Sequence, residues 1–168
     1  MLVKRFKDFL LESKSIMDES DGYYYEVDHY DQSYFCCLRM GRVESWEYFL
    51  YKKKKLCGEF ILDDISNERS IYGIDLKKYK NNLGNRIMYL AGIRSDVNGV
   101  GVMLMSKVIS ESKRLNYDSI VLSVCPEEHT ELSKLIDFYE HFDFEIFYGK
   151  KMVRPRKRHT VLMYLRIN

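Results

Sequence analysis

Residues 93–102, Ile-Arg-Ser-Asp-Val-Asn-Gly-Val-Gly-Val, place two glycines where a β-prone segment runs into an amphipathic helix. The first turn of a helix has backbone N–H groups without intrahelical acceptors, and it lies at the positive end of the helix dipole. Phosphate oxygens satisfy both demands. Gly99 and Gly101 lack a Cβ, so a phosphate can approach their amides closely. The stretch predicts an anion site, and Asn98 or Asp96 is placed to cap the same turn.

The glycines also fit an ordinary strand-loop-helix turn with a break at Asn98-Gly99. The glycines alone do not decide between this turn and an anion site. Other phosphate loops fit less well. A dinucleotide fingerprint requires a third glycine where this chain has Leu104, and no Gly-Lys-Ser/Thr follows for a nucleotide triphosphate loop. The elements around the loop therefore have to decide between an anion site and an ordinary turn.

Size and charge set outer bounds on the function. The chain has 168 residues, a length typical of one domain with a proper core. Its 27 basic and 25 acidic residues nearly cancel, so net charge predicts neither a nucleic-acid binder nor a membrane-surface protein. No apolar run approaches the length of a membrane span, and the charged start does not resemble a signal peptide. We expect a soluble, cytoplasmic protein that does not bind a membrane.

The four cysteines, Cys36, Cys37, Cys57 and Cys125, do not form the two-residue spacing of zinc or redox motifs. Reduced thiols in the cytoplasm are the expected state, and no metal site is predicted. Cys125 follows an apolar segment, and a buried, inert thiol is the expectation for it.

The first half of the chain predicts a helix followed by strands. Apolar spacing indicates an amphipathic helix over 2–17, and the acidic, tyrosine-rich segment 18–31 is expected to be a loop or a second short helix. The β-prone segments that follow are 33–40, 46–51 and 56–62, with a basic turn at 52–55 and a short strand at 71–74.

The second half predicts alternating strands and helices. The expected order is a strand over 86–93, a helix from about 99 to 115, a strand over 120–124, a helix over roughly 128–141, and strands around 144–148 and 160–167. The first two strands of this series would be parallel, because a helix connects them.

At this point the second half resembles the GNAT superfamily of acyl-CoA N-acyltransferases, over roughly residues 86–167. The family's pyrophosphate loop, Gln/Arg-x-x-Gly-x-Gly/Ala, falls on residues 96–101, Asp-Val-Asn-Gly-Val-Gly. Its later motif, an aromatic residue and a tyrosine near a helix end followed by Gly-Phe, falls on residues 138–144. Two departures stand out: Asp96 replaces the usual Gln/Arg, and Asp143 replaces the glycine. Asp143 is expected to adopt the left-handed conformation in its place.

The resemblance implies an α/β single-domain fold: a mixed, mostly antiparallel sheet with a central splayed pair of parallel strands, flanked by helices. We expect one domain over 1–168, with a helical, acceptor-side part over 1–32 and a core over 33–168. It also implies acetyl-CoA as co-substrate, with pantetheine along the strand and the pyrophosphate on backbone amides. The implied coenzyme-binding residues are Leu90, Ala91, Gly92, Ile93, Asn98, Gly99, Val100, Gly101 and Val102.

On the same resemblance, Tyr139 is the general acid that protonates the departing sulfur, and the alternative is an aromatic core residue. Acyl transfer also requires a base, because an amine is protonated at neutral pH. The sequence assigns none. The candidate bases are Glu59, Asp63 and Asp64, which would act through water; the alternative is that they are surface carboxylates. His141 is more typical of a surface histidine.

The implied function is an N-acetyltransferase that moves an acetyl group to a primary amine of a small molecule or peptide by direct attack in a ternary complex. One alternative is a catalytically inactive GNAT-fold binding or regulatory protein. The other is a nucleic-acid-associated protein that uses the basic segment 150–158, which also suits an acidic partner or a solvated hairpin tip. The acids of 18–31 suit a cationic acceptor or a solvated face. A monomer or a homodimer is expected.

Overall fold

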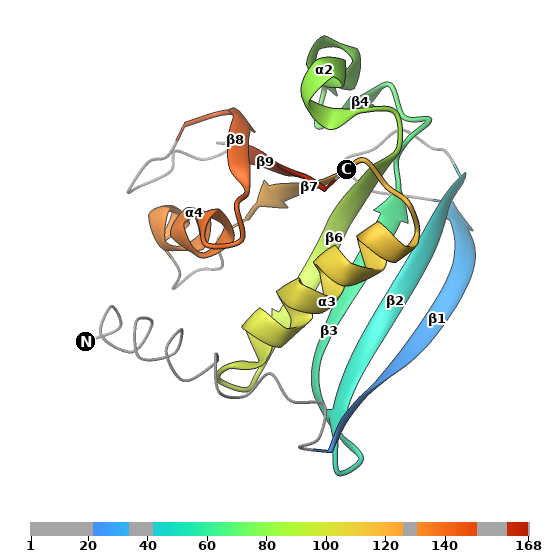
Figure 1. Ribbon diagram of the computed structural model, residues 1–168, viewed down its shortest axis with the longest axis vertical. Helices are drawn as coiled ribbons and strands as arrows, with labels where there is room; N and C mark the ends of the chain where they lie inside the picture. Colours follow the sequence, from blue (N-terminus) through green and yellow to red (C-terminus); the bar gives the residue numbers. More distant parts are fainter. Residues whose placement is uncertain (1–21, 34–41, 126–130, 151–160, 168) are drawn as a thin grey trace.

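A computed structural model describes residues 22–33, 42–125, 131–150 and 161–167 of the chain (Figure 1). Seven strands form one sheet, in the spatial order β1-β2-β3-β6-β7-β9-β8. Along the sheet these are β1 (Tyr23–Ser33), β2 (Arg42–Lys52), β3 (Lys55–Asp64), β6 (Ile87–Ser95), β7 (Ser119–Val124), β9 (Val161–Arg166) and β8 (Glu145–Tyr148).

The first half of the sheet is antiparallel, from β1 through β2 and β3 to β6. Lys53 and Lys54 join β2 to β3 with φ of 49° and 64°, so the predicted basic turn is a tight hairpin turn. Exposed lysines suit this turn because their side chains stay in water. The strands predicted over 46–51 and 56–62 are confirmed within β2 and β3.

The second half has the predicted order of elements. β6 and β7 pair in parallel, and the helix α3 (Val100–Arg114) connects them. β9 then pairs antiparallel with both β7 and β8, after the helix α4 (Leu132–Glu140). The mixed, mostly antiparallel sheet with one central parallel pair is therefore confirmed.

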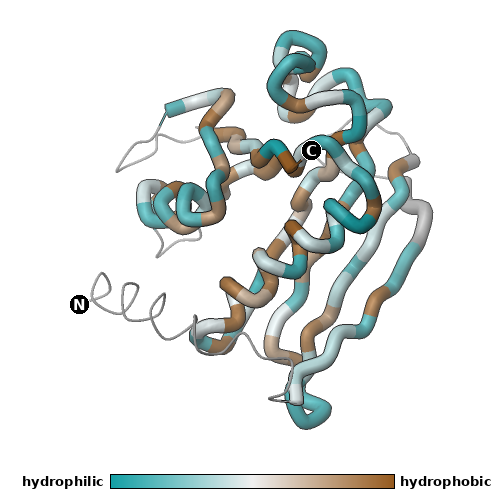
Figure 2. Tube along the Cα trace, in the orientation of Figure 1, coloured by the Kyte–Doolittle hydropathy of each residue, from teal (hydrophilic) through white to brown (hydrophobic). Residues whose placement is uncertain are grey.

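Alternating side chains divide the core between the two faces of the sheet. Met88 and Leu90 of β6 pack in one apolar cluster with α3 and α4, whereas Ile87 and Tyr89 pack in another. The second cluster includes the hairpin β4 (Ser70–Ile71) and β5 (Ile74–Asp75), the 3-10 helix η2 (Leu76–Tyr79) and α2 (Lys80–Leu83). Figure 2 shows hydrophobic and hydrophilic residues alternating along α3, as a half-buried helix requires.

Residues 18–31 were expected to be a loop or short helix, and this is wrong for the described part, since Tyr23–Ser33 is the edge strand β1. Tyr25 packs toward the core while Glu26 and Val27 are exposed, so the burial pattern of a strand is weak here. β1 pairs with β2 along its whole length, and this pairing makes the segment a strand although its local sequence does not predict one.

Some predictions fall outside the described residues. These are the helix over 2–17, the strand over 33–40 apart from Ser33, and residues 128–130 of the helix over 128–141. Among the helices in the described part of the chain, none has the length and apolar character that crossing a membrane requires.

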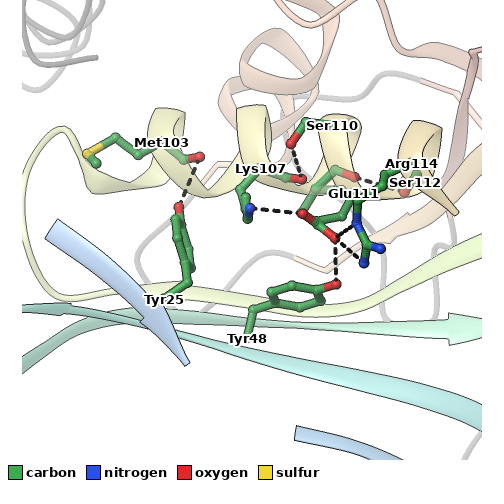
Figure 3. Close-up of polar contacts among 9 residues, drawn as sticks. Tyr25, Tyr48, Met103, Lys107, Ser110, Glu111, Ser112 and Arg114 are labelled. Carbon is green, nitrogen blue, oxygen red and sulfur yellow. Dashed lines mark hydrogen bonds and ion pairs between the residues drawn. The ribbon is translucent and has the colours of Figure 1, made fainter. Parts of the chain in front are cut away.

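A buried carboxylate fastens α3 to the sheet (Figure 3). Glu111 accepts a hydrogen bond of 3.1 Å from the Tyr48 hydroxyl on β2, and it forms ion pairs with Lys107 at 2.8 Å and Arg114 at 2.7 Å. Burial disfavours the charged form of Glu111, but the hydrogen bonds from Lys107 and Arg114 outweigh it, so the pKa of the carboxyl is lowered. Burial of the Tyr48 side chain, together with the negative charge of Glu111, raises the pKa of Tyr48 to about 12.

Glu111→Gln is expected to lower the free energy of unfolding by about 2 kcal/mol at pH 7, because charged hydrogen bonds are lost in a buried place. A lowered pKa in the folded state stabilises the fold above the carboxyl's ordinary pKa of 4.5, and this contribution disappears as the pH falls through the folded value. Urea denaturation at several pH values should therefore show the difference from wild type shrinking toward acid pH. Glu131→Gln, at an exposed ion pair with Lys134, is the matched control with little effect. A difference that persists at acid pH would contradict this role.

Gly58 on β3 allows α3 to lie close to the sheet. A Cβ at this position would lie 2.9 Å from both the Arg94 carbonyl oxygen and the Leu104 Cδ1. Gly58→Ala is expected to destabilise the fold by about 1–3 kcal/mol, the usual cost of overpacking. Thermal unfolding would measure it, with Gly92→Ala as the control, because a Cβ at Gly92 meets nothing within 4 Å. Equal stability of the two variants would refute the close packing.

Candidate functional site

The parallel strands β6 and β7 separate after a short paired segment. Their register runs from Ile87↔Ser119 to Leu90↔Leu122 and then stops, although β6 continues to Ser95. On the other side, the register with β3 shifts at Ala91, which lies in an irregularity between Leu90 and Gly92. Backbone groups near Ala91 are therefore displaced from the regular ladder, at the place where the strands diverge.

A pocket of about 170 Å³ occupies this divergence, and we call it the strand pocket. All four strand residues predicted to bind the coenzyme line it. Its lining residues are Tyr72, Tyr89, Leu90, Ala91, Gly92, Ile93, Leu122, Ser123, Cys125 and Tyr139.

A second pocket, of about 210 Å³, lies between the end of β6, the start of α3 and α4, and we call it the helix pocket. Its lining residues are Ile93, Ser95, Gly101, Cys125, Leu135, Phe138 and Tyr139. Ile93, Cys125 and Tyr139 line both pockets, so the two meet at these three side chains. One pocket thus lies against the start of α3 and the other against the face of the sheet that carries Tyr89.

The glycine loop leads directly into α3. Gly99 is the N-cap of the helix with φ of 90°, a left-handed conformation that glycine adopts without strain. The first turn has no hydrogen bond from a capping side chain within the described residues, so the expected cap from Asn98 or Asp96 is wrong. The residue at the cap position is Gly99, which has no side chain to accept the hydrogen bond. The Val100 N–H donates to the Val97 carbonyl oxygen at 3.3 Å, and the next amides of the first turn have no capping side chain among the described residues.

Gly101 brings the first turn of α3 to the helix pocket. A Cβ there would lie 3.8 Å from Phe138 Cζ, an ordinary contact. Val100 and Val102, in contrast, are buried at 1% and 8% exposure and anchor the turn to the core. Of the predicted residues Asn98–Val102, Gly101 lines the helix pocket, and the other four line neither of the two pockets.

Asp96 has a nearby counter-charge. Its Oδ1 lies 3.6 Å from Arg94 Nε, and both side chains are exposed. Ser95 fixes the loop between them, since its hydroxyl donates to the Val97 carbonyl oxygen at 2.9 Å. Arg94 therefore offsets part of the negative charge of Asp96 in this loop.

Tyr139 lies in α4 where the two pockets meet. It is 8% exposed, and its ring packs against Phe138 and Phe144. Burial, together with the nearby Cys125, raises the pKa of Tyr139 to about 12. Its hydroxyl therefore stays protonated at neutral pH, and within the described residues it has no hydrogen-bond partner. The ring packs in the core, and the residue also lines both pockets, so the role of Tyr139 as a general acid stays a prediction.

Cys125 directly follows β7, and its thiol is exposed. The expectation that this thiol is buried is wrong, because β7 ends at Val124 and Cys125, the residue after it, is exposed. Ser123 Oγ lies 3.5 Å from Cys125 Sγ.

Two tyrosines in the strand pocket were not predicted. The segment 71–74, expected as one short strand, is a hairpin whose turn is Tyr72-Gly73, with Tyr72 at φ of 51°. The Tyr72 hydroxyl lies 3.1 Å from that of Tyr89 on β6. A turn in the sequence gives no sign that it folds over a distant strand, so no local signal identifies this pair.

The candidate bases lie elsewhere. Asp63 is buried and accepts a 2.5 Å hydrogen bond from Ser45, and Asp64 binds Ser66. Glu59 lies beside Arg94, and His141 is exposed at the end of α4 and contacts the Asp137 carbonyl oxygen. Among the lining residues that the structure describes, neither pocket contains an acid or a histidine. Of the basic segment, only Lys150 lies within the described residues, where it is exposed.

Asp143 fulfils its expectation. It follows α4 with φ of 65°, the left-handed conformation in which glycine is usual. Phe144 after it is 2% exposed and packs in the core with Tyr139. The turn thereby fixes the end of α4, where Tyr139 lies.

No protein-family model and no curated protein matches the sequence. Solved structures match its fold. FeeM, an N-acyl amino acid synthase from uncultured soil microbes, is 15% identical with a TM-score of 0.55, over 73% of this chain and 67% of that one. An acetyltransferase assigned to the GNAT family from Desulfovibrio desulfuricans is 11% identical with a TM-score of 0.51, over 74% of this chain and 69% of that one. These matches show that the chain shares its fold with both proteins, one of which is assigned to the GNAT family.

Proposed function

We propose that the chain is an N-acetyltransferase that moves an acetyl group from acetyl-CoA to a primary amine of a small molecule or a peptide. One observation carries the proposal: two pockets meet at Tyr139, and one of them begins at the uncapped first turn of α3. An elongated ligand with an anionic end would reach from one pocket to the other past these side chains. The fold supports an acyltransferase, as in FeeM and the Desulfovibrio protein.

The coenzyme would lie with its pyrophosphate on the amides of Asn98–Val102 and its pantetheine arm along the end of β6. Aligned N–H groups and the helix dipole favour the phosphates. The arm would take the place of a strand neighbour beside Leu90–Ile93, where β7 has diverged. The thioester would then reach Ile93, Cys125 and Tyr139, where the pockets meet.

The amine would enter through the strand pocket and attack the thioester directly in a ternary complex. An N–H near Ala91 would stabilise the developing oxyanion, since a preorganised donor is most effective where charge develops. Tyr139 would donate its proton to the departing sulfur. The hydroxyls of Tyr72 and Tyr89 are the polar groups that an amine would meet on the opposite wall.

Calorimetry with acetyl-CoA is the first test, and release of free thiol with an acceptor is the second. The acceptors should include polyamines, aminoglycosides and lysine peptides, and also amino acids, because FeeM is an N-acyl amino acid synthase. Binding with turnover of at least one amine is the expected result. Coenzyme binding without turnover of any amine would instead support an inactive binding protein, and absence of coenzyme binding would refute the proposal.

A further inference from the structure

The thiol of Cys125 occupies the junction of the two pockets. It lines both of them and is exposed, whereas Cys57 is 6% exposed and packs in the core. Reaction of a cysteine requires access as well as a suitable partner. Of these two thiols, Cys125 is the one that a ligand in the pockets would meet.

The Tyr139 hydroxyl is an independent sign that a ligand group lies at this junction. The side chain is more than nine-tenths buried, it lines both pockets, and its hydroxyl has no hydrogen-bond partner among the described residues. The hydroxyl oxygen itself is not sealed in the core, so it can donate its hydrogen bond to a group in the pockets. A ligand atom that accepts its hydrogen bond would lie beside Cys125.

We propose that Cys125 is an acylation site, which takes the acetyl group from acetyl-CoA when no amine occupies the strand pocket. This inference rests on the proposed function, because acetyl-CoA is the donor. The Sγ atom attacks the thioester carbonyl carbon, the bond from this carbon to the coenzyme sulfur breaks, and a bond to Sγ forms. The thiol proton passes to solvent, and the coenzyme thiolate takes up one proton.

One thioester replaces another in this exchange, so it is close to balanced in free energy and free coenzyme A reverses it. Binding of the coenzyme places the two reacting groups together, which raises the rate far above that of free thioesters in solution. The acetyl group would then project from the shared wall of the pockets, in space that the amine needs. Cys125 would therefore compete with the acceptor for the acetyl group.

The test incubates the full chain with acetyl-CoA and no amine, followed by peptide mass spectrometry. We expect one acetyl group on the Cys125 peptide, removed by neutral hydroxylamine and by excess coenzyme A. Cys125→Ala should lose the mark, and Cys57→Ala should keep it. A small acetyl thioester without the nucleotide, at the same concentration, should label Cys125 far more slowly.

The possible outcomes distinguish failure of the acylation site from failure of the proposed acetyltransferase function. If calorimetry shows acetyl-CoA binding and Cys125 stays unmodified, the acylation site is refuted and the proposed function stands. Equal labelling of Cys57 and Cys125, or equal labelling by the small thioester, would also refute it, since both indicate unspecific reactivity. Absence of acetyl-CoA binding would refute the proposed function itself.

Discussion

Tyr139→Phe is expected to lower kcat for acetyl transfer about 100-fold, the lower end of what a general acid contributes. The lower end applies because a coenzyme thiol has a pKa of about 8.5 and leaves readily as a thiolate. Affinity for acetyl-CoA should change little, since the ring keeps its packing against Phe138 and Phe144. Stability should also persist, because the hydroxyl has no hydrogen-bond partner among the described residues to lose.

Steady-state kinetics and calorimetry on the same preparations would measure both quantities. Tyr148→Phe is the matched control, because Tyr148 on β8 is 41% exposed and lines neither the strand pocket nor the helix pocket. It should leave kcat and affinity at their wild-type values. An unchanged kcat in Tyr139→Phe would remove the residue from its assigned role.

Gly101→Asp is expected to weaken binding of acetyl-CoA strongly without weakening the fold. A carboxylate about 5 Å from a phosphate charge costs about 3 kcal/mol at an effective dielectric constant of about 20, or about 100-fold in Kd. The same charge in the first turn of α3 interacts favourably with the helix dipole. A Cβ at Gly101 also has room, at 3.8 Å from Phe138 Cζ.

Gly101→Asn separates charge from size, because the two side chains have almost the same shape. We expect Asn to retain much of the affinity, and the gap between Asn and Asp to narrow as salt rises. Calorimetry at two salt concentrations, with thermal unfolding as a check of the fold, would measure this. Equal Kd values for the two variants would place the phosphates away from the first turn of α3.

Local sequence identified those parts of the fold whose residues form regular patterns. The helix over about 99–115 has apolar residues at helical spacing, and the strand over 120–124 is a short apolar run; the structure contains them as α3 and β7. Gly99 was found because the left-handed conformation before a helix favours glycine, whereas Gly101 lies within the first turn of α3 and lines the helix pocket. Asp143 was found because the left-handed region admits few residue types.

The remainder depends on contacts between distant residues. Cys125 was expected to be buried from the usual behaviour of cysteine, but its exposure follows from the divergence of β6 and β7 after Leu90. Tyr72 reaches Tyr89 because a hairpin folds over the sheet, which no local pattern encodes. β1 mixes tyrosines with acids, and only pairing with β2 makes it a strand.

The central claim is that the joined pockets bind acetyl-CoA with its pyrophosphate on the first turn of α3, and a calorimetric titration tests it most directly. We predict saturable binding to a single site in wild type and in Tyr139→Phe, with strong weakening in Gly101→Asp. No binding by the wild-type chain at high micromolar acetyl-CoA would contradict the account.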